Sequence, residues 1–154
     1  MPQVSAGLLM YRRRGDQIEV LLVHPGGPIW ADRDDGAWSI PKGQAAPGEP
    51  LLEVACREFR EETGFEPVGP YRKLTPVRQK SGKIVHAWAF EGDCDPAMLR
   101  SNTFQMIWPP RSGRLQTFPE VDKAAFFSLE EAARKINGGQ VPLLAELRGL
   151  LDEA

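Results

Sequence analysis

The chain has 154 residues, of which 42% are hydrophobic and 26% are charged, an ordinary composition for a globular protein of this length. This length suits one domain with a substantial core, so we expect a single domain over residues 1–154. A net charge of −2 argues against the broad basic face that duplex nucleic acid requires, and small anions are therefore the expected partners.

The first part of the chain predicts strands rather than a targeting segment. No basic region followed by a long apolar run opens the chain, and no stretch is long enough to cross a bilayer, so we expect a cytoplasmic protein with no membrane partner. Residues 4–11 and 18–23 are apolar runs rich in strand-forming side chains. The segment RRRGDQ between them indicates a basic turn.

A long loop rich in Gly, Pro and Asp is expected over residues 24–37, and loops of this kind often carry specificity. Trp30 can stack on a nucleobase or pack on the body of the protein, and the sequence leaves both roles open. His24 has no second His or Cys spaced to join it in a metal site, so we expect it to be a structural histidine with satisfied ring nitrogens.

A short strand over residues 38–40 is expected to lead into Lys42 and Gly43. Lys42 can provide a point charge for a phosphate group, or it can be an ordinary surface lysine. The sequence supports both roles equally.

The next segment predicts a helix over residues 50–63. Pro50 suits the first helical position, where its missing N–H costs nothing, and Gly64 suits a left-handed C-terminal cap. Residues at helical spacing form the apolar face: Leu52, Ala55, Cys56 and Phe59.

Three carboxylates crowd the last turns of this helix. Glu58, Glu61 and Glu62 lie within about a third of the circumference, where the negative end of the macrodipole disfavours acids. One interpretation is a solvated acidic surface. The other is a magnesium site, because hard divalent cations prefer oxygen ligands and bridge carboxylates to phosphates. Glu53, Arg57 and Glu61 are spaced at i, i+4 and i+8, so ion pairs along this ladder can orient the side chain of Glu61.

After the helix, residues 71–79 and 83–90 are expected to form two strands joined by the turn Lys80-Ser81-Gly82. Residues 91–119 are expected to be irregular, apart from a strand candidate at residues 104–108.

The C-terminal part predicts a strand followed by two helices. Residues 120–127 lead into the strand, and a capping box of Ser128 and Glu131 predicts a helix as far as Ile136. Residues 141–151 carry a leucine stripe that is expected to pack on the sheet rather than to form a dimer interface.

Residues 43–65 resemble the Nudix box. The positions that carry the resemblance are Gly43, Glu49, Arg57, Glu58, Phe59, Glu61, Glu62, Gly64 and Phe65. All of them match, and a chain of this length would rarely contain such a pattern by chance. The preceding segment, Trp38-Ser39-Ile40-Pro41-Lys42, also resembles the approach to the box in Nudix hydrolases.

This resemblance implies an α/β fold, specifically an α/β/α sandwich with a mixed β-sheet. It implies Mg²⁺-dependent hydrolysis, with Mn²⁺ as a substitute metal, of a nucleoside diphosphate linked to another group. In that scheme Glu58, Glu61 and Glu62 correspond to metal ligands, Arg57 orients them, and a backbone carbonyl near Gly43 adds a ligand.

A further glutamate is expected in the loop before the last strand, and Glu120 matches that position. It would be a metal ligand or the general base, with a plain surface carboxylate as the alternative and Glu91 as the rival candidate. We therefore expect Glu61, Arg57 and Glu120 in the catalytic machinery.

The resemblance leaves the substrate open. Some Nudix subfamilies carry a marker proline or tyrosine after the box, whereas this chain has Lys80, Ser81, Gly82 and Lys83 there. We expect a nucleoside triphosphate or a dinucleoside polyphosphate, contacted by Lys42 and Trp30 and cleaved by metal-activated water at phosphorus. A noncatalytic nucleotide-binding module of the same fold is the alternative, and both a monomer and a homodimer are compatible with the sequence.

Overall fold

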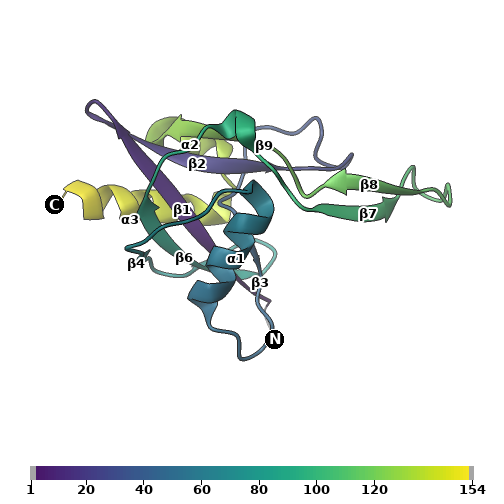
Figure 1. Cartoon of the computed structure of the whole chain (residues 1–154), viewed down its shortest axis with the longest axis horizontal. Coiled ribbons are helices and arrows are strands. Elements are labelled where there is room, and N and C mark those ends of the chain that lie inside the picture. The colour runs from purple at the N-terminus through teal and green to yellow at the C-terminus, as the bar shows by residue number, and fades with distance from the viewer. Residues whose placement is uncertain (1–2, 153–154) are drawn as a thin grey trace.

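A mixed β-sheet forms the centre of the protein in a computed structural model that describes residues 3–152 (Figure 1). Within these residues seven strands belong to this sheet, in the order β4-β6-β1-β2-β9, with β3 beside β1 and β5 beside β6. Their bounds are Val4–Arg14 (β1), Gln17–Pro25 (β2), Lys42–Gln44 (β3), Arg72–Lys73 (β4), Val77–Arg78 (β5), Ile84–Glu91 (β6) and Val121–Ser128 (β9).

The sheet is mixed because β1 and β6 run parallel while the other pairings are antiparallel. Leu8 lies opposite Trp88 in the parallel pair, and Gly7 lies opposite Lys42 in the antiparallel pair of β1 and β3. The first part of the long strand β1 therefore pairs with β3, which contains the start of the predicted Nudix box.

Helices cover both faces of the sheet. Helix α1 (Leu51–Thr63) packs against one face, and α2 (Leu129–Lys135) with α3 (Val141–Asp152) packs against the other (Figure 1). Alternation along β1 divides the core accordingly: Leu8 and Met10 face α1, whereas Leu9 faces α2 and α3. The predicted α/β/α sandwich with a mixed sheet is confirmed, and the leucine stripe of α3 packs on the sheet as expected.

Helix α1 closely follows its prediction. It begins at Leu51, with Pro50 as the N-cap rather than the first helical residue, and ends at Thr63, with Gly64 as the predicted C-cap in a left-handed conformation (φ 78°). Its predicted apolar face lies in the core cluster against β1. None of the helices in residues 3–152 is long and apolar enough to span a membrane.

Several predicted strands are wrong in extent. Residues 38–40 form only isolated bridges, Val23 to Ser39 and Trp38 to Ile136, and the strand next to them is β3. The predicted strand over residues 71–79 is interrupted and gives the two short strands β4 and β5. Helix α2 ends one residue early, at Lys135, although Ser128 Oγ does accept from the backbone N–H of Glu131.

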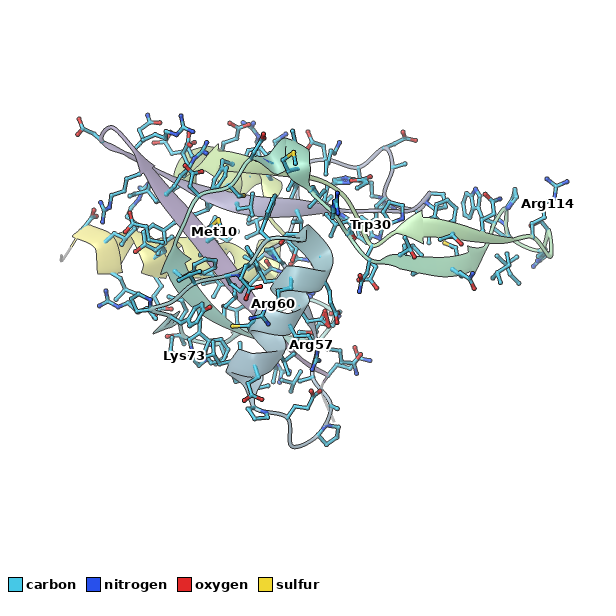
Figure 2. The ribbon with its side chains drawn as sticks, in the orientation of Figure 1. Met10, Trp30, Arg57, Arg60, Lys73 and Arg114 are labelled. Atoms are coloured by element: carbon cyan, nitrogen blue, oxygen red, sulfur yellow. The ribbon has the colours of Figure 1, made fainter. Side chains whose placement is uncertain are left out.

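The segment expected to be irregular contains a second, separate sheet. Strands β7 (Thr103–Ile107) and β8 (Leu115–Pro119) form an antiparallel hairpin. A short 3₁₀ turn, η1 (Pro96–Met98), precedes it, and a second one, η2 (Gly138–Gln140), lies later in the chain, before α3. The hairpin extends away from the sandwich, with Arg114 near its far end and Trp30 near its attached end (Figure 2). The strand candidate at 104–108 was therefore close to β7, whereas β8 was missed.

Candidate active site

The three carboxylates in the C-terminal turns of α1 face a fourth carboxylate, which comes from a distant part of the sequence. Glu120 lies between β8 and β9, and its charge acts on Glu58 and Glu62, while Glu61 acts on Glu120. The structure thus brings together the glutamates that the sequence predicted as a site. Glu91, the rival of Glu120, lies at the end of β6 opposite Tyr11.

Backbone hydrogen bonds hold Glu120 at the end of α1. The N–H of Gly26 donates to the carbonyl of Glu120 (2.9 Å), and the N–H of Glu120 donates to the carbonyl of Asn102 (2.8 Å). The N–H of Asn102 in turn donates to the carbonyl of Glu61 (2.8 Å). Because the last carbonyls of a helix lack intrahelical partners, this connection also caps α1.

The crowding of these acids is visible in their pKa values. Burial, followed by repulsion from Glu61, raises the pKa of Glu58 to about 7. Burial raises the pKa of Glu62 to about 8, with Lys42 opposing the shift and Glu58 adding to it. Partial burial and then Glu61 also raise the pKa of Glu120. A bound cation would relieve this accumulation of negative charge.

Gly43 is a glycine because Glu58 occupies the space where a side chain would be. A Cβ atom added at Gly43 would lie 2.0 Å from Cδ of Glu58. The carboxylate of Glu58 is therefore in contact with the backbone of β3, close to the backbone carbonyl region expected to contribute to a cation site.

Lys42 lies beside Glu62 rather than on an open surface. Its backbone N–H donates to Oε1 of Glu62 (3.3 Å), and the residue is partly buried. Burial, followed by the charge of Lys83, lowers the pKa of Lys42, and Glu62 opposes that shift. Lys42, Glu62 and Glu120 together line a small cavity of about 150 Å³.

The predicted ladder through Arg57 is wrong. Nη1 of Arg57 donates to Oε2 of Glu49 at 2.8 Å, instead of pairing with Glu53 or Glu61. Oε1 of Glu49 also accepts from the backbone N–H of Ala46 (2.7 Å), so that Glu49 organises the turn before α1. Helical spacing missed this pairing because the loop folds back along the helix, although both residues belong to the recognised box.

The residues present suit a hard divalent cation. The donor set consists of carboxylate oxygens, and the Gly43 backbone leaves space that Glu58 fills. As arranged, no three His, Cys, Asp or Glu side chains in residues 3–152 form a group that could hold a metal ion.

Trp30 lies outside the carboxylate cluster, on a cavity that Glu120 also lines. The same cavity is bordered by Phe104 and Met106 of β7, which the sequence did not identify as site residues. The alternation of polar and apolar residues in the sequence TFQMI of β7 was the available signal.

His24 is the structural histidine that was expected. Its side chain is fully buried at the end of β2, with Nδ1 2.8 Å from Oδ1 of Asp122 and Nε2 2.6 Å from the carbonyl oxygen of Arg33. It thereby connects β9 to the loop that carries Trp30.

Comparison with known proteins places this geometry in context. The family model described as the NUDIX domain matches residues 1–147. A curated mouse (Mus musculus) protein named bis(5'-nucleosyl)-tetraphosphatase [asymmetrical] is 35% identical over 99 residues, covering 56% of this chain and 63% of the mouse protein. This chain thus matches somewhat less than two thirds of the length of that relative.

Solved structures share the fold at low identity. A crystal structure of a Caenorhabditis elegans Ap4A hydrolase binary complex is similar with a TM-score of 0.66 and 23% identity, covering 97% of this chain and 99% of that one. The NUDIX domain of Shewanella oneidensis NrtR complexed with ADP ribose has a TM-score of 0.66 and 15% identity, covering 98% and 89% of the two chains.

Proposed function

Because this chain belongs to the NUDIX domain family, we propose that it is a phosphoanhydride hydrolase acting on a nucleoside diphosphate linked to another group. The observation that carries the proposal is the meeting of Glu58, Glu61 and Glu62 with Glu120, which is 58 residues further along the chain than Glu62. A helix surface that served only solubility would not require a fourth acid to be held against it by backbone hydrogen bonds.

We assign cation binding to the oxygen donors at this corner. Glu58, Glu61, Glu62 and Glu120, with a backbone carbonyl near Gly43, would hold Mg²⁺, or Mn²⁺ in its place. When bound, the divalent cation neutralises the diphosphate and lowers the pKa of a water molecule. Arg57, next to Glu58 and Glu61 and held by Glu49, keeps positive charge beside the glutamates.

The side chains of the chain then have separate tasks. Glu61 or Glu120 accepts the proton of the attacking water as it approaches phosphorus in line with the leaving oxygen. Lys42, which shares a cavity with Glu62 and Glu120, neutralises a phosphate oxygen of the substrate. Trp30 contacts the nucleoside, and its cavity meets the carboxylates at Glu120.

Among candidate substrates we favour dinucleoside polyphosphates over nucleoside triphosphates. The support is the printed name of the mouse relative, a bis(5'-nucleosyl)-tetraphosphatase, together with an open cavity next to the acidic cluster.

The test is a hydrolysis panel run with and without Mg²⁺. Dinucleoside tetraphosphates, nucleoside triphosphates, sugar nucleotides and ADP-ribose are supplied in turn, and the products are separated by ion-exchange chromatography. Metal-dependent release of a nucleotide product is expected, with Glu61→Gln as the matched inactive control. Tight nucleotide binding without turnover of any panel member would instead support the noncatalytic module.

A further inference from the structure

A second cavity lies next to the carboxylate cluster, between the loop after β2 and the β7–β8 hairpin. Its volume is about 380 Å³, within the range of small-ligand sites. Its lining is almost entirely apolar or backbone: Pro25, Gly26, Gly27, Pro28, Ile29, Trp30, Phe104, Met106 and Glu120.

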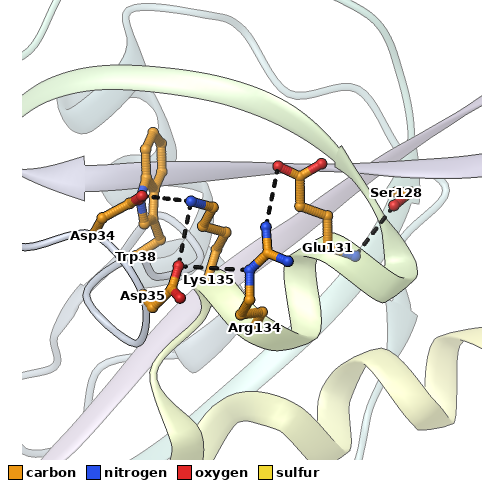
Figure 3. Close-up of polar contacts among 7 residues, drawn as sticks. All are labelled: Asp34, Asp35, Trp38, Ser128, Glu131, Arg134 and Lys135. Carbon is orange, nitrogen blue, oxygen red and sulfur yellow. Dashed lines mark hydrogen bonds and ion pairs between the residues drawn. The ribbon is translucent and has the colours of Figure 1, made fainter.

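One wall of this cavity is Trp30, and its loop is anchored at several points. His24 contacts the carbonyl of Arg33, and the guanidinium of Arg33 lies over the Trp30 ring, 5.4 Å from its centroid. Asp34 then accepts from Nε1 of Trp38 and pairs with Lys135 of α2 (Figure 3). An indole that is 39% exposed is thus held on a fixed loop instead of being buried.

The other wall is the inward face of β7. Phe104 and Met106 are half-buried, whereas Ile107 is 50% exposed on the opposite face of the hairpin. Gly27 lets the two walls meet, since a Cβ added there would lie 2.9 Å from Cζ of Phe104. Gly26 similarly lies against the carbonyl of Pro119 at the base of β8.

The position of the cavity indicates its occupant. Glu120 and Pro25 line both this cavity and the smaller one shared with Lys42 and Glu62, so the two cavities adjoin at these residues. A flat apolar group linked to a phosphate chain would therefore place its phosphates toward the carboxylates. A nucleobase has this shape and this connection to phosphate.

We propose that Trp30 on one wall and Phe104 and Met106 on the other form a subsite that binds the flat face of a nucleobase without reading its edge. The proposal rests on the function proposed above, because it supplies the base of that nucleotide. Edge recognition requires fixed donors and acceptors, and Glu120 and the indole N–H of Trp30 are the polar side-chain groups among the described residues of the lining. Aromatic faces accept every base, so purines and pyrimidines should bind alike.

Calorimetric titrations without divalent cation test the subsite separately from hydrolysis. The probes are AMP, GMP, CMP and UMP, with ribose 5-phosphate as the probe that lacks a base. We expect the four mononucleotides to bind within about tenfold of one another and ribose 5-phosphate to bind at least tenfold more weakly. Trp30→Ala and Phe104→Ala should each weaken all four by roughly tenfold and leave ribose 5-phosphate unchanged.

Matched controls separate the cavity from the rest of the hairpin. Ile107→Ala removes an apolar side chain from the opposite face of β7 and should leave every affinity unchanged. Phe104→Leu keeps most of the packing volume of the hairpin base but removes the aromatic face, so it replaces Phe104→Ala in the titrations if the alanine variant unfolds. Circular dichroism confirms the fold of each variant.

Several outcomes would overturn the proposal. These are a single base bound more than a hundredfold tighter than the others, equal binding of ribose 5-phosphate, or no binding of mononucleotides at millimolar concentration. Self-association in sedimentation runs that is lost in Ile107→Ala and unaffected by nucleotide would assign the hairpin to a second copy of the chain. Base binding as predicted in a protein that hydrolyses nothing would retain the subsite and reject the proposed hydrolase.

Discussion

The backbone N–H of Lys42 donates a hydrogen bond to the Glu62 carboxylate across 3.3 Å. This contact joins β3 to the end of α1 and places a partly buried acid beside a partly buried lysine. The fold therefore fixes the position of Glu62. Burying its charged carboxylate costs free energy that a neutral side chain would not cost.

Replacing Glu62 by Gln should separate stability from activity. The amide oxygen can still accept from the N–H of Lys42, and the carboxylate whose pKa burial raises is removed, so the metal-free variant should be at least as stable as the parent. Turnover of the best substrate should fall by about two or more orders of magnitude. Urea unfolding in EDTA and steady-state kinetics measure the two effects. Glu61→Gln should lose activity in the same way, and parental rates in both variants would refute the site.

The metal-free protein should become less stable as the pH rises from 5 to 8.5. Folding raises the pKa of Glu62 from 4.5 to about 8 and that of Glu58 to about 7, so the unfolded chain releases these protons first. The stabilising difference is complete below about pH 4.5 and is lost as the pH passes the folded values. The contribution of Glu62 is on the order of a few kcal/mol, and that of the more open Glu58 is smaller.

Denaturant midpoints in EDTA at several pH values measure this loss. Glu62→Gln should show a flatter profile than the parent, and added Mg²⁺ should stabilise the parent most at the alkaline end. A parent and a variant with identical slopes would show that Glu62 does not titrate as described.

The Arg57–Glu49 pair should matter more for activity than for stability. Both side chains are substantially exposed, so the pair should contribute less than about 1 kcal/mol to the free energy of unfolding. Glu49→Ala and Arg57→Ala should each lower kcat by about ten- to a hundredfold, as loss of an outer partner of metal ligands does. Glu53→Ala is the control, because the predicted ladder through Glu53 is not formed. A larger loss of activity in Glu53→Ala than in Glu49→Ala would contradict this arrangement.

A methyl group at Gly43 should disable the site and leave the fold intact. Gly43→Ala would bring Cβ to 2.0 Å from Cδ of Glu58, and the flexible Glu58 side chain would move aside. Mn²⁺ affinity, followed by electron paramagnetic resonance, should weaken by about tenfold or more. Gly149→Ala on α3 meets no atom within 4 Å and should leave metal affinity unchanged. Equal affinities in the two variants would show that Glu58 is not a ligand.

Loss of the His24 ring nitrogens should loosen the Trp30 loop. His24→Phe retains the ring shape but leaves Asp122 and the carbonyl of Arg33 without their partner. The free energy of unfolding should fall by about 1–3 kcal/mol. KM for nucleotide substrates should rise while kcat changes little, since the ring touches neither the carboxylates nor the cavity. A fall in kcat at constant KM would indicate a different role.

Local periodicity made much of the fold predictable. The apolar face of α1, its C-cap at Gly64 and the capping of α2 by Ser128 follow from spacings within one or two helical turns. The strands β1 and β2 likewise follow from continuous apolar runs. These elements depend on neighbours in sequence, and their prediction needed no knowledge of the sheet order.

The second strand of the hairpin, β8, was missed because the strands of the hairpin gain little from burial. Residues of β7 and β8 alternate between exposed and half-buried positions on a two-stranded sheet, and Leu115 is 62% exposed. A turn segment of Pro, Ser and Gly between them indicates irregular structure equally well.

The amino-acid sequence by itself determined the acid-rich helix and the placement of three glutamates on one side of it, because these depend on contacts a few residues apart. The resemblance to the Nudix box implied the α/β class. Only the tertiary structure decided that Glu120 rather than Glu91 meets those glutamates, and that Arg57 pairs with Glu49 rather than with Glu53. Which distant groups meet depends on how the strands are ordered and how loops return over the sheet. Spacing along the chain does not specify the order of the strands or the course of the loops, because both depend on burying the two faces of the sheet at the same time.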